Sequence, residues 1–309
     1  MNVIDQNISD KWALYHGDCV DVMRGLPDNS VHYSIFSPPF ASLYTYSASP
    51  RDMGNVATHS DFYDQYRYAV AEMYRITKPG RLLSFHCMLL PTSKARDGFI
   101  GLTDFRGELI RIHTEAGWIF HSEVTIWKDP VTAMQRTKAL GLLHKQIRKD
   151  STMSRQGIAD FLVTMRKPGT NAEPVPHTGE GDDIPVSMWQ RYASPVWAVV
   201  DGADDEGFGV CKEDIDPTDT LQYRSAREHN DERHICPLQL EVIRRAVKLW
   251  SNPGDVVFSP FAGIGSELHT ALTMGRRAVG AELKRSYYDQ AVRNLAAAVS
   301  ESTSQLSMF

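Results

Sequence analysis

A strand–turn–helix–strand segment near the C-terminus, residues 255–283, constrains the fold more than any other part of the sequence. It reads DVVFSPFAGIGSELHTALTMGRRAVGAEL, in which a hydrophobic run leads into Gly263 and Gly265. Two glycines so placed allow a sharp turn and a close approach of backbone N–H groups to a ligand. The second strand ends at Glu282, where a carboxylate can accept hydrogen bonds from ribose hydroxyls. The segment predicts a site for a nucleoside cofactor or, in the plainer interpretation, a glycine turn needed only for close packing.

Strand and helix signals alternate along the chain. Hydrophobic runs rich in β-branched and aromatic residues indicate strands, and apolar side chains at helical spacing indicate helices. We expect strands at 31–36, 81–87, 118–127, 159–165, 255–259 and 277–282, and helices at 61–77, 104–116, 237–250 and 266–274. Lys78-Pro79-Gly80 is expected to close the first of these helices. This alternation predicts an α/β fold with a mostly parallel sheet covered by helices on both faces. The dinucleotide fingerprint GxGxxG is absent, because Ser266-Glu267-Leu268 follows Gly265, and this argues against an oxidoreductase.

The composition is that of a globular protein. Hydrophobic residues make up 42% of the chain and charged residues 23%, which is enough for a sizeable core. The formal net charge is −5, so a nucleic-acid-binding protein with this balance must concentrate its positive charge on one face. The four cysteines include no CxxC pair, which favours neither a disulfide framework nor a metal site. Because no signal peptide or run of roughly 20 apolar residues is visible, we expect a cytoplasmic protein without a membrane partner.

A stiff turn, Ser37-Pro38-Pro39-Phe40, follows the strand expected at 31–36. Prolines end a strand because they cannot donate to its hydrogen-bond ladder. The end of a sheet strand is also the usual place for ligand groups in open α/β sheets. Ser37 and the Pro38 carbonyl could accept hydrogen bonds from an amine, and Phe40 offers an aromatic face to a base. By itself the turn is equally compatible with a proline-rich β-turn that has no role.

The SPPF turn and, later in the sequence, the FAGIG loop resemble two motifs of the DNA amino-methyltransferases. Ser37 to Phe40 match the catalytic [DNS]PP[YFW] motif, and FAGIG, residues 261–265, matches the FxGxG cofactor loop. The order of the motifs is that of the family's β class, and the resemblance covers about residues 12–90 and 230–297. It implies a Rossmann-like fold and the transfer of a methyl group from S-adenosylmethionine to a base amine in duplex DNA, without a metal. The implied target is N6 of adenine, narrowly favoured as the commoner activity, or N4 of cytosine, which Ser37 favours.

The resemblance also implies the site residues. Asp18, in Gly17-Asp18-Cys19, is expected to hold the adenine amino group of the cofactor, and Glu282 its ribose. Ser259 departs from the family pattern, which often has Asp before the Pro-Phe pair, and His234 could equally be a local cap. The implied catalytic residues are Ser37, Pro38, Pro39 and Phe40, and the implied cofactor-binding residues are Asp18, Cys19, His234, Pro237, Leu238, Ser259, Phe261, Gly263, Gly265, Ser266 and Glu282.

The middle of the chain separates the two motif regions. We expect residues 1–127 and 234–309 to be the catalytic and cofactor-binding halves of one domain. Residues 128–233 are expected to be an inserted target-recognition region with an acidic, solvated loop at 201–219. Residues 128–155 carry seven basic side chains against two acidic ones, a cluster that suits phosphates or, more plainly, a solvated helical face. The loop after SPPF could contact DNA or cover the cofactor as a lid. The residues expected to contact DNA are Tyr44, Tyr46, Arg51, Lys128, Gln135, Arg136, Lys138, Lys145, Arg148, Lys149 and Arg155.

Other classes of function remain open at this point. One is a methyltransferase for RNA or a small molecule, and another is a DNA-binding module that has lost its activity. No endonuclease signature accompanies the motifs, so we expect a solitary enzyme or the modification half of a restriction–modification system in a bacterium or phage. The resemblance further suggests a homodimer.

Overall fold

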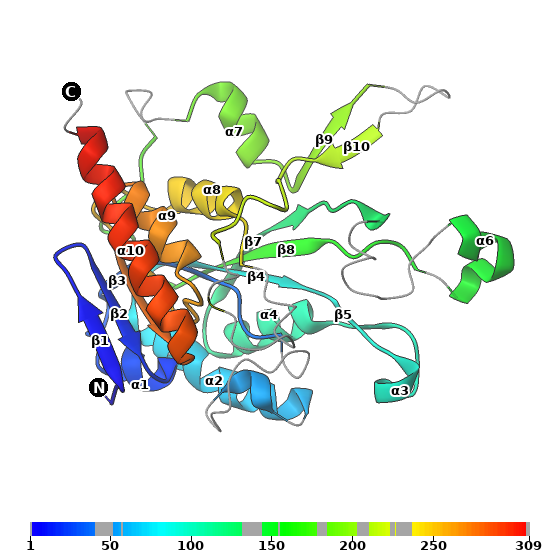
Figure 1. Ribbon diagram of the computed structural model, residues 1–309, viewed down its shortest axis with the longest axis horizontal. Helices are drawn as coiled ribbons and strands as arrows, with labels where there is room; N and C mark the ends of the chain where they lie inside the picture. Colours follow the sequence, from blue (N-terminus) through cyan, green and yellow to red (C-terminus); the bar gives the residue numbers. More distant parts are fainter. Residues whose placement is uncertain are drawn as a thin grey trace.

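The computed structural model describes residues 2–40, 52–56, 58–131, 144–153, 155–177, 184–202, 210–222, 226 and 237–306. Within these ranges, a ten-stranded sheet has the order β1-β2-β12-β11-β3-β4-β8-β7-β9-β10, and a small hairpin pairs β5 with β6 (Figure 1). The strands are β1 (Asp5–Ile8), β2 (Trp12–His16), β3 (Val31–Phe36), β4 (Thr77–Met88), β5 (Leu90–Pro91), β6 (Leu102–Thr103), β7 (Ile119–Ile126), β8 (Asp160–Arg166), β9 (Val196–Asp201), β10 (Val210–Glu213), β11 (Val256–Ser259) and β12 (Arg277–Glu282).

The centre of the sheet is parallel, and its direction fixes where a ligand can bind. Strands β2, β12, β11, β3 and β4 are parallel neighbours in that order, whereas β8 is antiparallel to both β4 and β7. The chain leaves β3 toward β4 and leaves β11 toward β12, in opposite directions along the sheet. The strand order therefore reverses between β3 and β11, and a crevice outside the carboxyl ends of such strands is the general ligand site of open α/β sheets.

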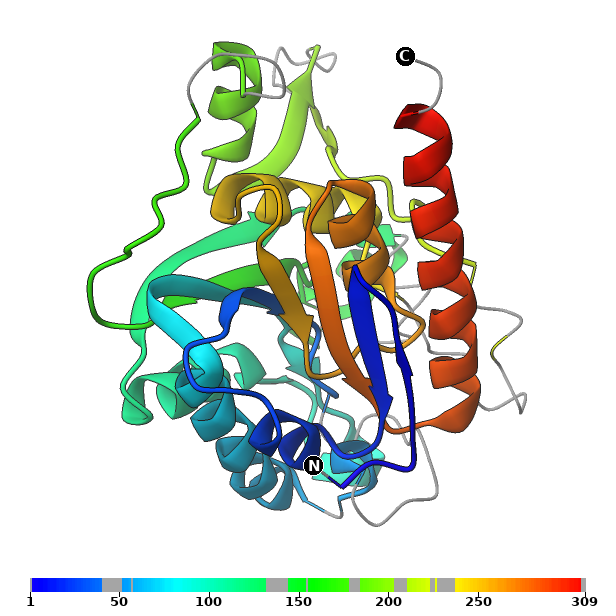
Figure 2. The same ribbon diagram turned by 90° about the vertical axis from the view of Figure 1, so that its left-hand side faces the viewer.

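Helices cover both faces of the sheet (Figures 1 and 2). Helices α1, α2 and α4 pack on one face around Phe36, Phe85 and Phe258, and α8, α9 and α10 lie on the other face. The helices and 3-10 turns of the described residues are α1 (Cys19–Arg24), η2 (Met53–Asn55), α2 (His59–Ile76), α3 (Lys94–Asp97), α4 (Phe105–Glu115), α6 (His144–Asp150), η3 (Ser151–Met153), α7 (Val186–Tyr192), α8 (Leu240–Trp250), α9 (Ser266–Thr273) and α10 (Arg285–Leu306). Within the described ranges, no helix combines the length and apolar character needed to cross a bilayer.

The expected α/β architecture is confirmed, and one expected helix end is wrong. Lys78-Pro79-Gly80 begin strand β4 instead of closing the preceding helix, which ends at Ile76. Within the segment 128–233, β8 pairs with β4 and β7 in the main sheet, and β9 and β10 extend that sheet beyond β7. Asp214, expected in a solvated acidic loop, forms a buried ion pair with Arg245 of α8. The acidic composition of this region therefore includes a structural carboxylate that anchors it to the helix layer.

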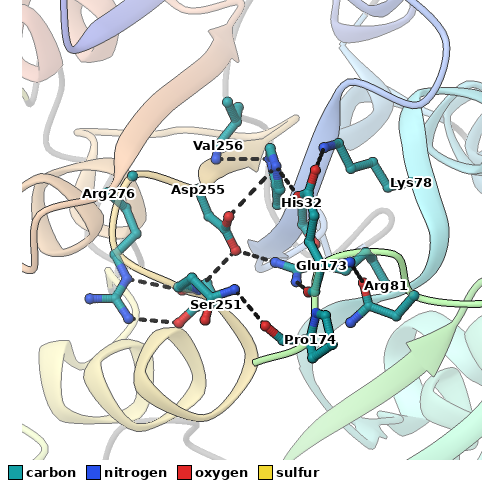
Figure 3. Close-up of polar contacts among 12 residues, drawn as sticks. His32, Lys78, Arg81, Glu173, Pro174, Ser251, Asp255, Val256 and Arg276 are labelled. Carbon is teal, nitrogen blue, oxygen red and sulfur yellow. Dashed lines mark hydrogen bonds and ion pairs between the residues drawn. The ribbon is translucent and has the colours of Figure 1, made fainter. Parts of the chain in front are cut away.

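A polar junction ties the strands together near their amino ends (Figure 3). His32 Nδ1 accepts a hydrogen bond from the Val256 N–H, and His32 Nε2 lies 2.9 Å from a carboxylate oxygen of Glu173 and 3.6 Å from one of Asp255. Arg81 pairs with Asp255, and Lys78 pairs with Glu173. Among the described residues, His32, Glu173 and Asp255 are the one group spaced as metal ligands could be. Since each carboxylate is already paired with a basic side chain, we interpret the group as an ion-pair network that anchors the segment after β8.

Candidate active site

The candidate site lies where the parallel strands end. Asp18 follows β2, Ser37 follows β3, and Phe261 follows β11, while Glu282 is the last residue of β12. These four strands are consecutive parallel neighbours in the sheet, so their carboxyl ends share one edge. The Phe36 and Phe261 rings, one from each side of the reversal point, lie 5.8 Å apart between centroids. The two motifs, which lie far apart in the sequence, are thus neighbours in space.

The glycine loop has the conformation that its sequence predicts. Gly263 and Gly265 have φ angles of +53° and +87°, in the left-handed region that favours glycine. A Cβ on Gly265 would also approach the Ala291 Cβ of α10 to 3.2 Å. The Gly263 N–H donates to Glu282 Oε2 over 2.7 Å, which locks the loop to the end of the next strand. The turn therefore packs closely against α10 and the end of β12, and the approach of a ligand to it stays a prediction.

Glu282 is placed to receive hydroxyl donors. Its Oε1 accepts from the Lys284 N–H over 2.8 Å, and each of its oxygens keeps a second lone pair. Burial raises the pKa of Glu282 to about 7. Burial, with a contribution from Glu282, also raises the pKa of the neighbouring Glu267 to about 8. A ligand that donates hydrogen bonds to Glu282, or carries positive charge nearby, would favour the ionised form of these carboxyls.

Asp18 and Cys19 open helix α1 at the same edge. Asp18 is the N-cap residue, and its Oδ1 accepts from the N–H groups of Val20 and Asp21. Within the described part of the chain, these are the hydrogen bonds of this carboxylate, so Oδ2 keeps its capacity to accept from a ligand. The Cys19 side chain points into the core under α2, and its burial raises the pKa of the thiol well above the ordinary value. Only the backbone of Cys19 is therefore suited to contact a ligand.

Buried polar atoms at this edge test whether an adenosyl cofactor fits. The Oγ atoms of Ser259 and Ser266 and the Oδ2 atom of Asp52 are buried, and none has a hydrogen-bond partner among the described residues. Ser259 ends β11, Ser266 begins α9, and Asp52 lies close enough to Glu282 to raise the pKa of its carboxyl. Unpaired buried polar atoms are costly and rare in folded proteins. Their grouping around the glycine loop fits a polar ligand with several donors and acceptors, such as an adenosine with an amino-acid tail.

The SPPF turn places its groups beside this loop. Ser37 and Phe40 are partly exposed at the end of β3, while Pro38 is buried. The Phe40 ring packs against Phe105 of α4, with 6.1 Å between centroids, which holds the ring in position. The arrangement leaves a hydroxyl and an aromatic ring at the reversal point of the sheet. Stacking of Phe40 on a base stays a prediction.

A buried polar chain behind Ser37 was not anticipated from the sequence. His86 Nδ1 lies 3.1 Å from Ser37 Oγ, and His86 Nε2 lies 2.9 Å from Asp160 Oδ2. Lys128, whose contact with DNA stays a prediction, forms an ion pair with the same oxygen of Asp160. Burial alone would raise the pKa of Asp160, but Lys128 and His86 outweigh it and lower this pKa to about 2. The sequence signals for these contacts were weak, because His86 and Asp160 lie in strands that carry other polar residues as well.

The other residues expected at the site are distributed as follows. Leu238 is buried in the core against α8, and Pro237 precedes it at partial exposure. Arg148 and Lys149 are exposed on α6, which lies beyond the ends of β4 and β8 in Figure 1, and Arg155 is partly buried. Lys145 lies on the same helix, but its side chain is outside the described residues. Also outside the described residues are Tyr44, Tyr46, Arg51, Gln135, Arg136, Lys138 and His234.

The fold and the site together define a class: an open α/β protein with two adjacent loops, the SPPF turn and the FAGIG loop, at the reversal point of its sheet. The comparisons with known proteins give the family. A model of the N6/N4 family, described as DNA methylase, matches residues 31–293. The chain belongs to this family.

Individual relatives match either a short part of the chain or most of it at lower sequence identity. The type II methyltransferase M.BglII of Bacillus subtilis is 33% identical over 81 residues, which cover 26% of this chain and 22% of that protein. The type II methyltransferase M.BamHI of Bacillus amyloliquefaciens is 21% identical over 275 residues, covering 89% of this chain and 55% of that protein. The match thus spans less than a quarter of the first relative and little more than half of the second.

Solved structures share the fold over nearly the whole chain. The Thermus thermophilus protein TTHA0409, in its complex with S-adenosyl-L-methionine, has a TM-score of 0.63 at 23% identity, covering 93% of this chain and 95% of that one. The PvuII DNA methyltransferase, described as cytosine-N4-specific, has a TM-score of 0.61 at 12% identity, with coverage of 97% and 96%. These likenesses confirm the expected methyltransferase fold.

Proposed function

We propose that this protein is a DNA methyltransferase that transfers a methyl group from S-adenosylmethionine to the exocyclic amino group of a base. The observation that carries the proposal is the adjacency of two loops. The SPPF turn follows β3, the FAGIG turn follows β11, and these strands pair directly, with Phe258 opposite Ser34. An amine held by the first loop and a methyl donor held by the second would therefore lie next to each other.

The cofactor would be held mainly by the carboxylates of the edge. Glu282 would accept from the ribose hydroxyls and Asp18 Oδ2 from the adenine amino group, while the N–H groups of the 261–265 loop pass beneath the nucleoside. Ser259 Oγ and Ser266 Oγ would gain partners that they lack within the described protein. When bound, S-adenosylmethionine supplies a methyl carbon activated by a positive sulfur.

The residues after β3 would prepare the amine. The lone pair of an exocyclic base amine is delocalised into the ring, which makes the nitrogen a poor nucleophile. Ser37 and the Pro38 carbonyl would accept its two hydrogens and favour the pyramidal amine that can attack, a preorganised electrostatic contribution. Phe40, braced by Phe105, would stack on a base rotated out of the duplex. The remaining part of the barrier would be lowered by the orientation of the amine nitrogen toward the methyl carbon.

The target base is one of two. N6 of adenine and N4 of cytosine are both amines next to a ring nitrogen, so the same acceptor pair suits each. Adenine is the commoner target in the family, which favours it narrowly, whereas the serine at position 37 favours cytosine. We keep cytosine as the second candidate for that reason.

The remaining partners follow from this proposal. Duplex DNA would contact α6 and the basic segment around it, with residues 128–155 as part of the target-recognition region. The enzyme would act in the bacterial cytoplasm, alone or beside a restriction endonuclease encoded elsewhere. A homodimer is a further hypothesis, and sedimentation that shows a monomer with and without DNA would remove it.

Mass spectrometry of nucleosides tests the function directly. Unmethylated duplex DNA is incubated with the protein and S-adenosylmethionine carrying a labelled methyl group, with a Ser37→Ala, Phe40→Ala double variant as the control. Labelled N6-methyladenine or N4-methylcytosine that is absent with the control would support the proposal and identify the base. Label in RNA or a small molecule but in neither DNA base would overturn it.

A further inference from the structure

We propose that His86 takes up the hydroxyl proton of Ser37 during methyl transfer, and that Asp160 and Lys128 hold His86 in the tautomer that allows this. His86 is thus a positioning residue that acts on the substrate through Ser37. The inference rests on the proposed function, because it assigns a proton path within that reaction.

Four side chains from four consecutive segments of the sheet form the path. Ser37 follows β3, His86 lies near the end of β4, Asp160 begins β8, and Lys128 follows β7. Since β8 is antiparallel to its neighbours, its first residue reaches the same edge as the ends of β4 and β7. The side chains of His86 and Asp160 are only 10% and 4% exposed. The path therefore runs from the partly exposed serine into the protein, shielded from water.

The partners of His86 decide where its proton lies. Asp160 is ionised, because its pKa is about 2, so it can only accept hydrogen bonds. The ring nitrogen that faces it, Nε2, must therefore carry a proton. Lys128 already balances the charge of Asp160, so the ring is not required as a cation. A neutral ring with a proton on Nε2 presents a lone pair at Nδ1, which accepts a hydrogen bond from the Ser37 hydroxyl.

This orientation makes Ser37 an acceptor toward the substrate. When its only hydrogen points to His86, both lone pairs of Ser37 Oγ are free to face the amine. A protonated ring would do the reverse, because Nδ1–H would donate to Ser37 and turn the hydroxyl hydrogen toward the base. Lys128 thus helps to keep Ser37 oriented as an acceptor toward the amine, although Asp160, His86 and Ser37 lie between Lys128 and the amine.

The step balances without any further reagent. The amine nitrogen forms a bond to the methyl carbon with its lone pair, and the carbon–sulfur bond breaks with its electron pair left on sulfur. The nitrogen then carries one proton too many. That proton passes to Ser37 Oγ as the hydroxyl proton of Ser37 passes to His86 Nδ1, so the positive charge ends on an imidazolium beside the Asp160 carboxylate. His86 returns the proton to solvent after the methylated base has left.

A purely structural role is the alternative, and the same strands provide a matched control. Two residues before His86 on β4, and on the same face of the sheet, Ser84 shares a 2.8 Å hydrogen bond with Thr164 of β8. This contact also joins β4 to β8 in the buried interior, but it does not reach Ser37. If His86 only ties two strands together, its loss should resemble the loss of Ser84.

Single-turnover methyl transfer to duplex DNA at saturating S-adenosylmethionine separates the two roles. We expect His86→Ala to slow transfer about tenfold to a hundredfold, within the range of proton-transfer catalysis, and Ser84→Ala to change it less than about twofold. Calorimetry should show S-adenosylmethionine binding unchanged in both. The double variant Ser37→Ala, His86→Ala should be no slower than Ser37→Ala alone, because residues that act as one unit are non-additive. Multiplied losses in the double variant, or equal effects of His86→Ala and Ser84→Ala, would overturn the proposal.

A second readout is independent of activity. In ¹⁵N NMR of the histidine rings at pH 7, the signal that disappears in His86→Ala should show a protonated Nε2 and an unprotonated Nδ1. A proton on Nδ1 would overturn the proposal even if the rates agreed. His86→Gln replaces His86→Ala if the smaller side chain prevents folding. A wild-type protein that methylates no DNA base would refute the proposed function as a whole, whereas an active wild type with a fully active His86→Ala would refute only the role of His86.

Discussion

The two sides of the reversal point are built in different ways. On the cofactor side, Asp18, Gly263 and Glu282 lie in turns or at strand ends. Asp18 accepts from a backbone N–H group of its own helix, and Glu282 accepts from the backbone N–H groups of Gly263 and Lys284. On the amine side, Ser37 depends on His86, Asp160 and Lys128, which side-chain contacts link across three further segments. One side is thus formed by local loops, and the other is assembled across the sheet.

This difference should determine how each side fails. A ligand-binding side chain in a loop can be substituted with little effect beyond the loss of its own contact, since backbone hydrogen bonds still hold the turn. In a buried chain of charges, the loss of one member leaves its neighbour with an unbalanced charge or proton. We therefore expect cofactor-side substitutions to change mainly affinity, and amine-side substitutions to change mainly the rate of the chemical step.

The largest effect is expected from Ser37→Ala. The substitution removes the acceptor that grips the amine, and the loss of one preorganised hydrogen-bonding group typically lowers the rate about 10²–10³-fold. Single-turnover kinetics with labelled S-adenosylmethionine measure this, and calorimetry should show unchanged cofactor affinity. A parallel loss of cofactor binding would mean that the two sides are not separable in the way the structure indicates.

The next largest effect is expected from Glu282→Gln on the opposite side. A neutral amide weakens the charge-assisted hydrogen bonds to ribose, and such bonds contribute about 1.5–3 kcal/mol each. We expect the Kd for S-adenosylmethionine to rise about tenfold to a hundredfold, with the single-turnover rate at saturation within about threefold of wild type. Calorimetry followed by kinetics at saturating cofactor checks both. A large fall in the saturated rate would argue against the division of labour.

Cofactor binding should also depend on pH through the same carboxylate. Burial raises the pKa of Glu282 to about 7 in the free protein, so below pH 7 the group is mostly protonated. Ribose donors favour the ionised form, so binding must release a proton there and should tighten, by up to about tenfold, between pH 6 and pH 8. Calorimetry in buffers of different ionisation enthalpy counts the protons released.

A matched variant separates the contributions of the two buried carboxyls, Glu282 and Glu267, to this pH dependence. Glu267, whose pKa is raised to about 8, is protonated between pH 6 and pH 7 and contributes no pH dependence there unless the ligand ionises it. Glu267→Gln should leave the change between pH 6 and 7 in place, whereas Glu282→Gln should remove it. Proton release that persists in Glu282→Gln would assign the effect elsewhere.

The same contrast explains how much the sequence could predict. The 255–283 segment carries its strand, turn, helix and acid within 29 consecutive residues, so its local geometry followed from local rules. The turn at Ser37 is likewise marked in the sequence by two prolines, and the turn at Asp18 by a helix N-cap residue. The expected strands and helices around these motifs are found with small shifts of their ends, apart from the residues 78–80 that join β4.

What escaped prediction depends on pairing between distant strands. His86 and Asp160 are 74 residues apart, and they meet only because β8 returns antiparallel beside β4. A strand that runs against the parallel set has no signature in its own sequence. Asp214 was misassigned to a solvated loop for the same reason, because its partner Arg245 comes from a later helix. Lys128 looked like part of a basic patch, since composition does not reveal that its charge is already paired.

The smallest expected effect concerns that basic patch and sharpens the distinction between its members. Arg148 and Lys149 are exposed on α6, whereas Lys128 is held by buried Asp160. Arg148→Ala, Lys149→Ala should flatten the dependence of log K for DNA on log salt by about 1.8, since each phosphate contact contributes about 0.9. At physiological salt this weakens binding by about tenfold or less. Fluorescence anisotropy over a salt series measures it.

Two single variants complete the comparison. Arg24→Ala, in the last turn of α1 at the end of that helix away from the site, should leave the slope unchanged. Lys128→Met should also leave the slope unchanged but slow methyl transfer, because its ammonium balances Asp160 and not a phosphate. A slope that falls by about 0.9 in Lys128→Met would return this lysine to the DNA surface. A slope unaffected in the α6 double variant would make that helix an ordinary solvated face.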